Sequence, residues 1–201
     1  ALTGAAIAGV STTYATAANA GAVSFTNIQG DDIVIASASI VNTATSTSGH
    51  LKAGSYNQTA TAISGDDSAN YSFAGVTTTD NNYVVNKLAL TGAAIAGVTT
   101  TYATAADAGA VSFTNVQGTD KVTASASIVG GSNSTSGHLK AGSYQQTATA
   151  INGDDAGNYS FGGITTADNN YVVDKKSISL SGITAASKVY DASNAATVSV
   201  S

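Results

Sequence analysis

Two pairs of adjacent aspartates are the side chains best suited to chemistry in this chain, Asp66-Asp67 and Asp154-Asp155. Each pair follows a glycine, and carboxylates beside backbone carbonyls are the hard oxygen ligands that Ca²⁺ prefers. A calcium site would use these four carboxylates first, with Asp80 and Asp168 as the next candidates. The spacing, however, matches neither an EF-hand loop nor a glycine-rich calcium-binding repeat. The alternative is a structural turn, in which the glycine has a positive φ and the aspartates accept hydrogen bonds from local amides.

One histidine recurs after the tetrapeptide Ser-Thr-Ser-Gly, at His50 and His138. A catalytic histidine needs a nucleophile and an orienting acid, and a metal site needs further ligands. The chain contains no Cys and no Glu, so we expect exposed structural histidines and no enzyme. Lys52 and Lys140 follow these histidines, and a Lys–Asn cross-link would require that either lysine be buried beside an Asn and a catalytic acid.

The chain consists of two closely similar copies of one unit and the beginning of a third. Residues 1–88 align with residues 89–176 without a gap and differ at 19 positions. Near Ser177 a third copy begins, with Leu180-Ser181-Gly182 corresponding to Leu2-Thr3-Gly4. We therefore divide the chain into a first repeat at 1–87, a second repeat at 88–175 and an incomplete third repeat at 176–201. Tandem copies this similar are typical of a periodic array, in which each unit has another copy as its neighbour.

Differences between the copies indicate which positions face solvent. Ile33 and Ile35 are replaced by polar residues in the second copy, whereas Val34 between them is retained. Alternate residues of a strand point to opposite faces, so Val34 is predicted to face the core. Residues 42–45 change most between the copies, which is typical of an exposed loop.

The composition favours strands and turns. Charged residues make up 9% of the chain, against roughly 25% in an ordinary globular domain. Apolar and polar residues alternate with a period of two at 21–26 and 34–40, and Gly-Asp and Asn-rich turns separate such segments. Six or seven short strands per copy predict an all-β fold, namely Ig-like β-sandwich repeats of about 88 residues arranged end to end. The alanine-rich segments 15–22 and 103–110 are the one place where a helical turn is conceivable.

Aromatic rings are expected to fill the core at equivalent places in the two copies. The expected residues are Phe25, Tyr71, Phe73 and Tyr83 in the first copy, and Phe113, Tyr159, Phe161 and Tyr171 in the second.

Charge and hydropathy exclude several classes of partner. The net charge is −5 and the pI is about 4.5, which argues against binding to nucleic acid or to anionic lipid. No apolar run is long enough to insert into a membrane, and without cysteine there is no disulfide scaffold.

Segments 63–73 and 151–161 read ISGDDSANYSF and INGDDAGNYSF, and they resemble the SGxDAGNYSL signature of YDG/MBG-type repeats. Residues 187–198, SKVYDASNAATV, are similar to the KVYDGTTAAT opening of the same repeat, with Ala192 in place of a glycine. The resemblance implies a tandem repeat of a filamentous-haemagglutinin-like bacterial adhesin or exoprotein. Such a protein is extracellular or on the cell surface, and the resemblance implies no catalytic residues.

Repetition and resemblance together predict a structural segment, that is, a stalk, spacer or matrix filament. The alternative is an adhesive module for carbohydrate or a host surface, which exposed Tyr and Asn side chains at 80–83 would support. The junction at 83–95 contains no proline and no polar spacer, so we expect a short, stiff joint between the repeats. The expected partners are neighbouring repeats of the same protein in a filament or array.

Overall fold

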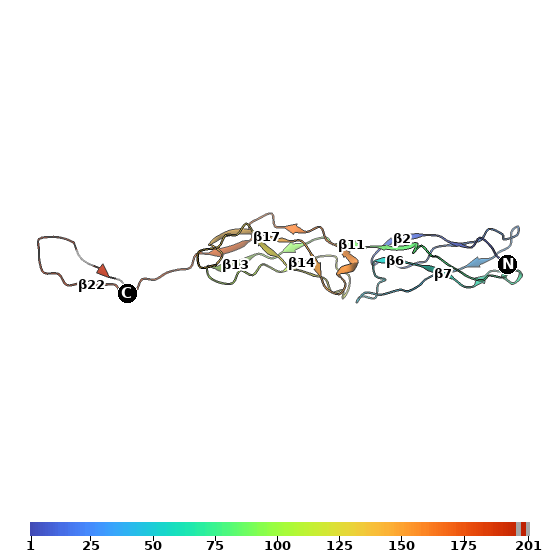
Figure 1. The fold of residues 1–201 in the computed structure, drawn as a ribbon, viewed down its shortest axis with the longest axis horizontal. Helices are drawn as coiled ribbons and strands as arrows, with labels where there is room; N and C mark the ends of the chain where they lie inside the picture. The colour runs from blue at the N-terminus through green and yellow to red at the C-terminus, as the bar shows by residue number, and fades with distance from the viewer. Residues whose placement is uncertain (196–197, 200–201) are drawn as a thin grey trace.

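The structure, a computed structural model, describes residues 1–195 and 198–199, and it is all-β with no α-helix in that part of the chain (Figure 1). The first copy contains β1 (Ala6–Ile7), β2 (Val10–Thr13), β3 (Val23–Ser24), β4 (Ile35–Ala36), β5 (Ser39–Ile40), β6 (Gly54–Tyr56), β7 (Gln58–Ala60), β8 (Ile63–Ser64), the 3₁₀ turn η1 (Ser68–Asn70), β9 (Val76–Thr77) and β10 (Tyr83–Asn86).

The second copy repeats this order, except that β17 spans the counterparts of β6 and β7 and that β11 and β19, which pair with one another, have no counterpart strands in the first copy. It contains β11 (Leu88–Ala89), β12 (Ala94–Ile95), β13 (Val98–Thr101), β14 (Val111–Ser112), β15 (Thr123–Ala124), β16 (Ser127–Val129), β17 (Gly142–Ala148), β18 (Ile151–Asn152), the 3₁₀ turn η2 (Ala156–Asn158), β19 (Tyr159–Ser160), β20 (Ile164–Thr165) and β21 (Tyr171–Asp174). The strands are shorter and more numerous than the sequence predicts, because interruptions divide segments such as 34–40 into two strands.

In each copy the last strand pairs with a four-residue strand near the start of the copy. β10 pairs in parallel with β2, with Tyr83 opposite Val10, and pairs on its other edge antiparallel with β6. β21 pairs in the same way with β13 and β17. The beginning and end of each copy are therefore hydrogen-bonded to one another, although about 70 residues of chain lie between them.

The aromatic core is smaller than the sequence predicts. Tyr83 and Tyr171 are fully buried and Tyr159 is almost so, as expected. Phe25 and Phe73 are only partly buried, and they pack edge to face with ring centroids 5.2 Å apart. Phe113 and Phe161 form the equivalent pair, while Tyr71 is also partly exposed. These five residues are half-buried rather than fully buried, because the mostly short strands around them supply few neighbours to cover them.

A buried glutamine is at the centre of each copy and was not predicted. Gln58 has no exposed surface, and its side chain bonds three separate segments. The Gly21 amide donates to its Oε1 at 2.6 Å, and its Nε2 donates to the Ala8 carbonyl and to Asn82 Oδ1. A Cβ at Gly21 would lie 1.9 Å from the Ala8 carbonyl oxygen, so this close approach requires glycine. Gln146 makes the same three bonds in the second copy.

Other predictions for the surface agree with the structure or are corrected by it. Val34 is buried whereas Ile33 and Ile35 are exposed, and the loop at 42–45 is exposed. No helical turn forms at 15–22 or 103–110. Instead Ala15 has a φ of 68° in a tight turn, in which the Thr16 amide donates to the Thr13 carbonyl.

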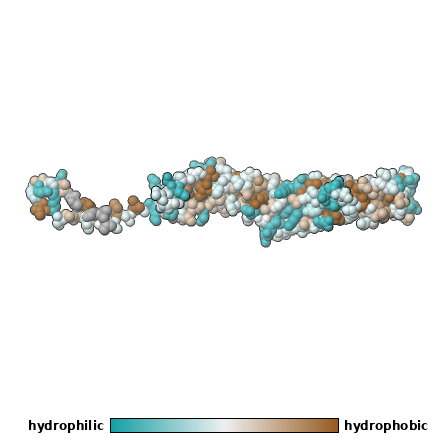
Figure 2. Space-filling view, in the orientation of Figure 1, coloured by the Kyte–Doolittle hydropathy of each residue, from teal (hydrophilic) through white to brown (hydrophobic). Residues whose placement is uncertain are grey.

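The two copies lie end to end along the longest axis, and the chain continues beyond them as an extended segment (Figure 1). Hydrophilic and hydrophobic residues are interspersed over the face drawn in Figure 2. In the part of the chain that is described, no helix is long and apolar enough to cross a membrane.

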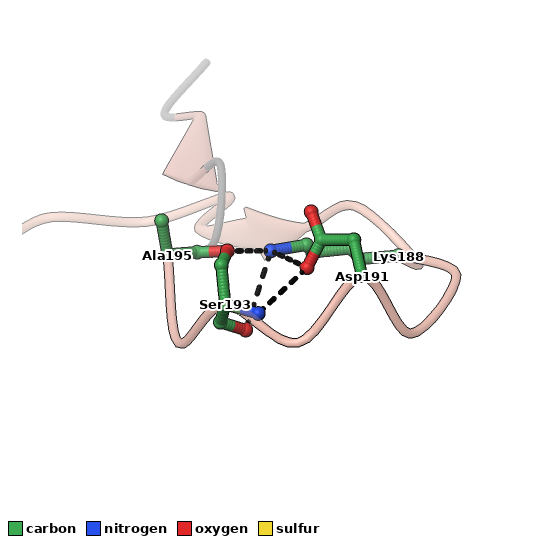
Figure 3. Close-up of polar contacts among 4 residues, drawn as sticks. All are labelled: Lys188, Asp191, Ser193 and Ala195. Carbon is green, nitrogen blue, oxygen red and sulfur yellow. Dashed lines mark hydrogen bonds and ion pairs between the residues drawn. The ribbon is translucent and has the colours of Figure 1, made fainter.

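The third copy begins with the same hairpin as the first two. β22 (Thr184–Ala185) pairs antiparallel with β23 (Val198–Ser199), as β1 pairs with β3. Lys188 holds the turn between them: its Nζ lies 2.8 Å from Asp191 Oδ1 and donates to the carbonyls of Ser193 and Ala195 (Figure 3). The hairpin does not fold back onto the second copy, and Tyr190 is 90% exposed.

The buried glutamine gives the first prediction. Replacing Gln146 by alanine leaves the Gly109 amide and the Ala96 carbonyl unpaired in the core. We expect the free energy of unfolding, measured with urea, to fall by about 3 kcal/mol. The matched control is Gln145→Ala, since that neighbouring side chain makes one bond, to the Ala167 carbonyl, and its loss should cost below about 0.5 kcal/mol. Equal losses in the two variants would contradict the role given to Gln146.

Candidate functional site

The predicted aspartates have separate tasks in the structure. Asp66 is exposed, and Asp154 is exposed beside Lys121 at 3.8 Å. Asp67 accepts a hydrogen bond from the Ile33 amide at 2.8 Å, and Asp155 is 2% exposed. Among the residues that the structure describes, no three His, Asp, Glu or Cys side chains gather as a metal-binding group. Calcium binding by these pairs stays a prediction that the geometry does not test.

The turn around these aspartates differs in one respect from the expected turn. Gly65 and Gly153 have φ values of 108° and 112°, as predicted. The aspartate side chain that accepts hydrogen bonds in each turn, Asp67 or Asp155, does not bond an amide of its own turn. Asp67 bonds an amide 34 residues away, and Asp155 bonds the equivalent Lys121 amide together with an amide of the other copy. The prediction of local bonding was wrong, because each turn packs against a neighbouring segment rather than standing alone.

Hydrogen bonds from several segments of both copies meet at the joint between the copies. At its centre is Asp120, which is 9% exposed. Its Oδ2 accepts hydrogen bonds from Tyr14 of the first copy at 2.5 Å and from Tyr159 of the second at 2.6 Å. Its Oδ1 accepts a bond from the Ser48 amide at 3.0 Å. One carboxylate therefore bonds two segments of the first copy and one of its own.

The two tyrosines share this carboxylate as donors. Each hydroxyl has a single proton, so Tyr14 donates it to Asp120 and accepts from Ser46, whose Oγ lies at 2.5 Å. Tyr159 donates likewise and accepts from the Gln117 amide at 2.9 Å. The rings of Tyr14 and Tyr159 also pack edge to face, with centroids 5.3 Å apart.

The proton affinities follow from this geometry. Burial alone would raise the pKa of Asp120, but hydrogen bonds from Tyr14, Tyr159 and Ser48 outweigh it and lower the pKa to about 2. Burial and the bond to Asp120 raise the pKa of Tyr14 to about 12, and the same two causes raise the pKa of Tyr159. At neutral pH Asp120 is therefore ionised, and the phenols of Tyr14 and Tyr159 are neutral.

A second row of hydrogen bonds lies beside the first. Asp155 accepts from the Thr47 amide at 3.1 Å, and Asn158 accepts from the Ala53 amide at 3.0 Å. Ser48 Oγ donates to the Gln117 carbonyl at 2.7 Å, and Thr119 donates its amide to that Oγ at 2.9 Å. Three backbone amides of the loop at 46–53 therefore donate to side-chain oxygens of the second copy, so none of the three loses its hydrogen bond when the joint excludes water.

The recurring histidine supports this loop. The Ser46 amide donates to the His50 carbonyl, which closes the loop, and the His50 ring packs edge to face on Tyr14 at 5.7 Å. His138 has the same place beside Tyr102 in the second copy, at 5.8 Å. Neither histidine has a nucleophile or an acid as a hydrogen-bond partner, and the arrangement is one of packing.

A shallow groove of about 460 Å³ lies at the same place in each copy, between the alanine-rich segment and the loop that contains the histidine. In the second copy it is bordered by Ala105, Ile128, His138 and Leu139. No Phe, Tyr or Trp lines either groove, and the aromatic ring beside the groove of the second copy is the imidazole of His138.

Sequence reasoning selected Asp155 but missed Asp120, Asn158 and the serines of the loop. Asp120 is aligned with Asp32, and both copies retain the carboxylate. That signal is weak, because most positions are identical between the copies, and only the structure shows that a side chain of one copy serves the other.

Comparisons with family models, curated proteins and solved structures find no match to this chain.

The carboxylate at the joint gives the second prediction. We expect Asp120→Asn to weaken the joint by about 2 kcal/mol, because an amide oxygen replaces a charged acceptor for two phenols and one amide. The measurement is urea unfolding of the full chain, in which the second copy should lose stability and the two transitions should separate. Asp32→Asn is the matched control, since the same residue in the first copy has no copy before it in the structure. An equal effect of both substitutions would contradict the account.

Acid should release the same contacts. The pKa of Asp120 is lowered from 3.8 to about 2 in the folded chain, so its contribution is fully present above about pH 4 and is lost as the pH falls through 2. Asp155, whose pKa is also lowered by the Lys121 and Thr47 bonds against the effect of burial, acts in the same direction. We expect a loss on the order of 2 kcal/mol between pH 5 and pH 2. Calorimetry at several pH values measures it, and an Asp120→Asn chain that keeps the full acid dependence would refute it.

Proposed function

We propose that this chain is a structural repeat segment, a stalk or spacer, of a large extracellular or surface-exposed bacterial protein of adhesin type. The observation that carries the proposal is the joint, in which the first copy supplies donors and the second copy supplies buried acceptors. A surface of this kind fixes the direction of one repeat relative to its neighbour, which is what a stalk requires.

The finer assignment of the fold belongs to the same proposal. Each copy is built as an Ig-like β-sandwich, with the repeats at 1–87 and 88–175 and the start of a third at 176–201. Antiparallel pairs such as β4 with β8 and β5 with β7, closed by the parallel pair of β2 and β10, support it. The resemblance of segments 63–73 and 151–161 to YDG/MBG-type repeats supports the extracellular bacterial setting.

An adhesive module for carbohydrate is the second candidate, and the groove that recurs in both copies is the observation that favours it. Glycan-array binding by the full chain distinguishes the two candidates. A stalk gives no saturable binding, whereas a ligand whose binding is lost when Leu51→Arg and Leu139→Arg together close both grooves would establish the adhesive module.

The stalk gives a third prediction. Inserting one further copy of residues 88–175 after Lys175 should lengthen the particle by one repeat and leave its cross-section unchanged, since each copy joins the next end to end. Small-angle scattering measures both quantities. A maximum dimension that stays constant while the cross-section grows would show side-by-side packing and contradict the proposal.

A further inference from the structure

We propose that each copy bears tension along the axis of the chain, and that the parallel pairs β2–β10 and β13–β21 are the elements that resist it. We call these two pairs the clamps. Resistance to tension goes beyond the proposed function, because a stalk or spacer requires only a fixed direction. It rests on that function in one respect, the end-to-end order of the copies (Figure 1).

The two strands of a clamp run in the same direction along the molecule. β2 is followed by Tyr14, whose hydroxyl reaches Asp120 of the second copy, and β10 is followed directly by β11 of the second copy. Both strands therefore end at the joint. Both begin at the end away from it, since their first residues, Val10 and Tyr83, are opposite one another. Tension that enters before β2 and leaves after β10 pulls the strands past each other along their length.

The strand through which tension enters a copy has a single strand partner in the described part of the chain. β2 and β13 are edge strands of the sheets ordered β2-β10-β6 and β13-β21-β17-β16. The contact of β13 with β21 is four residue pairs long. At its start the Val98 amide donates to the Asn170 carbonyl at 2.9 Å, and beyond its end the Tyr102 amide donates to the Asp174 carbonyl at 2.8 Å. Tension on β13 therefore reaches the rest of its sheet through the bonds to β21.

Shear loads all of these bonds together. The hydrogen bonds of a parallel pair are evenly spaced and lie across the strands, so strands that are pulled along their length stretch every bond before any one breaks. A force that peels the strands apart from one end breaks the bonds one at a time, and each of them alone contributes little. The same contact therefore resists shear more strongly than it resists peeling.

Buried side chains shield each clamp from water. Tyr83 and Val85 of β10 are 0% and 5% exposed, and Tyr171 and Val173 of β21 have the same values. Hydrogen bonds in such surroundings are electrostatically stronger than hydrogen bonds in water. Water is also the molecule that would replace a stretched backbone bond, and these side chains keep it away.

The acceptors of the joint lie outside the path of the tension. Asp120, Asp155 and Asn158 all belong to the part of the chain between β13 and β21. While the clamp of the second copy holds, this part is not stretched, because tension passes from β13 directly to β21. The clamp therefore keeps the acceptors in position for the first copy.

Single-molecule pulling of the full chain in two directions tests the clamp of the second copy. DNA handles at Ala96→Cys and Lys175→Cys load β13 and β21 in shear, and the protein has no cysteine of its own. Handles at Thr101→Cys and Lys175→Cys peel the same pair from one end, because Thr101 is opposite Asp174. The three substituted residues are exposed. Unfolding of the copy should lengthen the tether by roughly 250 Å in either direction, which identifies the event.

We expect the unfolding force in shear to be at least about twice the force in peeling at the same loading rate, because forced unfolding is governed by the unfolding rate and shear requires several bonds to break together. Equal forces in the two directions would overturn the proposal. That result would leave the stalk standing, since small-angle scattering tests the end-to-end order separately.

Two proline substitutions in β13 test the backbone bonds under shear. The amides of Val98 and Tyr102 both point to β21. Amides at every second position of a strand face the same neighbour, so the Thr100 amide faces β21 and the Thr99 amide faces away. Thr100→Pro should lower the shear force to about the peeling force, because it removes a bond from the middle of the clamp.

Thr99→Pro is the matched control and should leave the shear force unchanged, since proline is tolerated in an edge strand where no donor is needed. Equal shear forces for the two proline variants would also overturn the proposal. If Thr100→Pro does not fold, the comparison of the two pulling directions decides the outcome.

Discussion

A carboxylate shared between two copies is the constraint on which the arrangement of this chain depends. A buried charge is stable only when hydrogen bonds replace the water that it has lost, and Asp120 obtains its bonds from both copies. Separating or rotating the copies would remove the bonds from Tyr14 and Ser48 together. The cost of that loss restricts the joint to one geometry, which an apolar contact of similar size would not do.

The same logic operates inside each copy on a smaller scale. With short strands and few large apolar residues, packing alone defines the positions of the loops weakly. Gln58 and Gln146 make up for this weak packing, because each buried side chain forms hydrogen bonds to three segments and so fixes their positions. Charged residues make up only 9% of the chain, and buried amides, phenols and carboxylates supply the polar contacts that position these segments.

The sequence predicted the features that depend on local pattern. The period of two indicated an all-β chain, and the exchange of Ile33 and Ile35 for polar residues correctly identified Val34 as the inward position. The positive φ of Gly65 followed from its place before two aspartates. Each of these features is determined by residues close together along the chain.

Features that depend on contacts between distant residues were missed. The partly exposed Phe25–Phe73 pair has the composition of a core but too few neighbours to be covered, and composition does not reveal this. The site at the joint was missed for a related reason. Tyr71 and Tyr159 have the same local sequence, yet only Tyr159 is buried, because another copy precedes it. A repeat that is considered alone cannot show which of its residues serve a neighbour.

The shared carboxylate should hold the joint rigid, and a distance distribution across the joint measures that rigidity. Spin labels at Ser39→Cys and Ser127→Cys occupy equivalent exposed sites, one in each copy. Pulsed electron paramagnetic resonance should give one narrow distance distribution at neutral pH, and a broad one when Asp120→Asn is added. A broad distribution in the chain with native Asp120, or one that the substitution leaves unchanged, would contradict the claim.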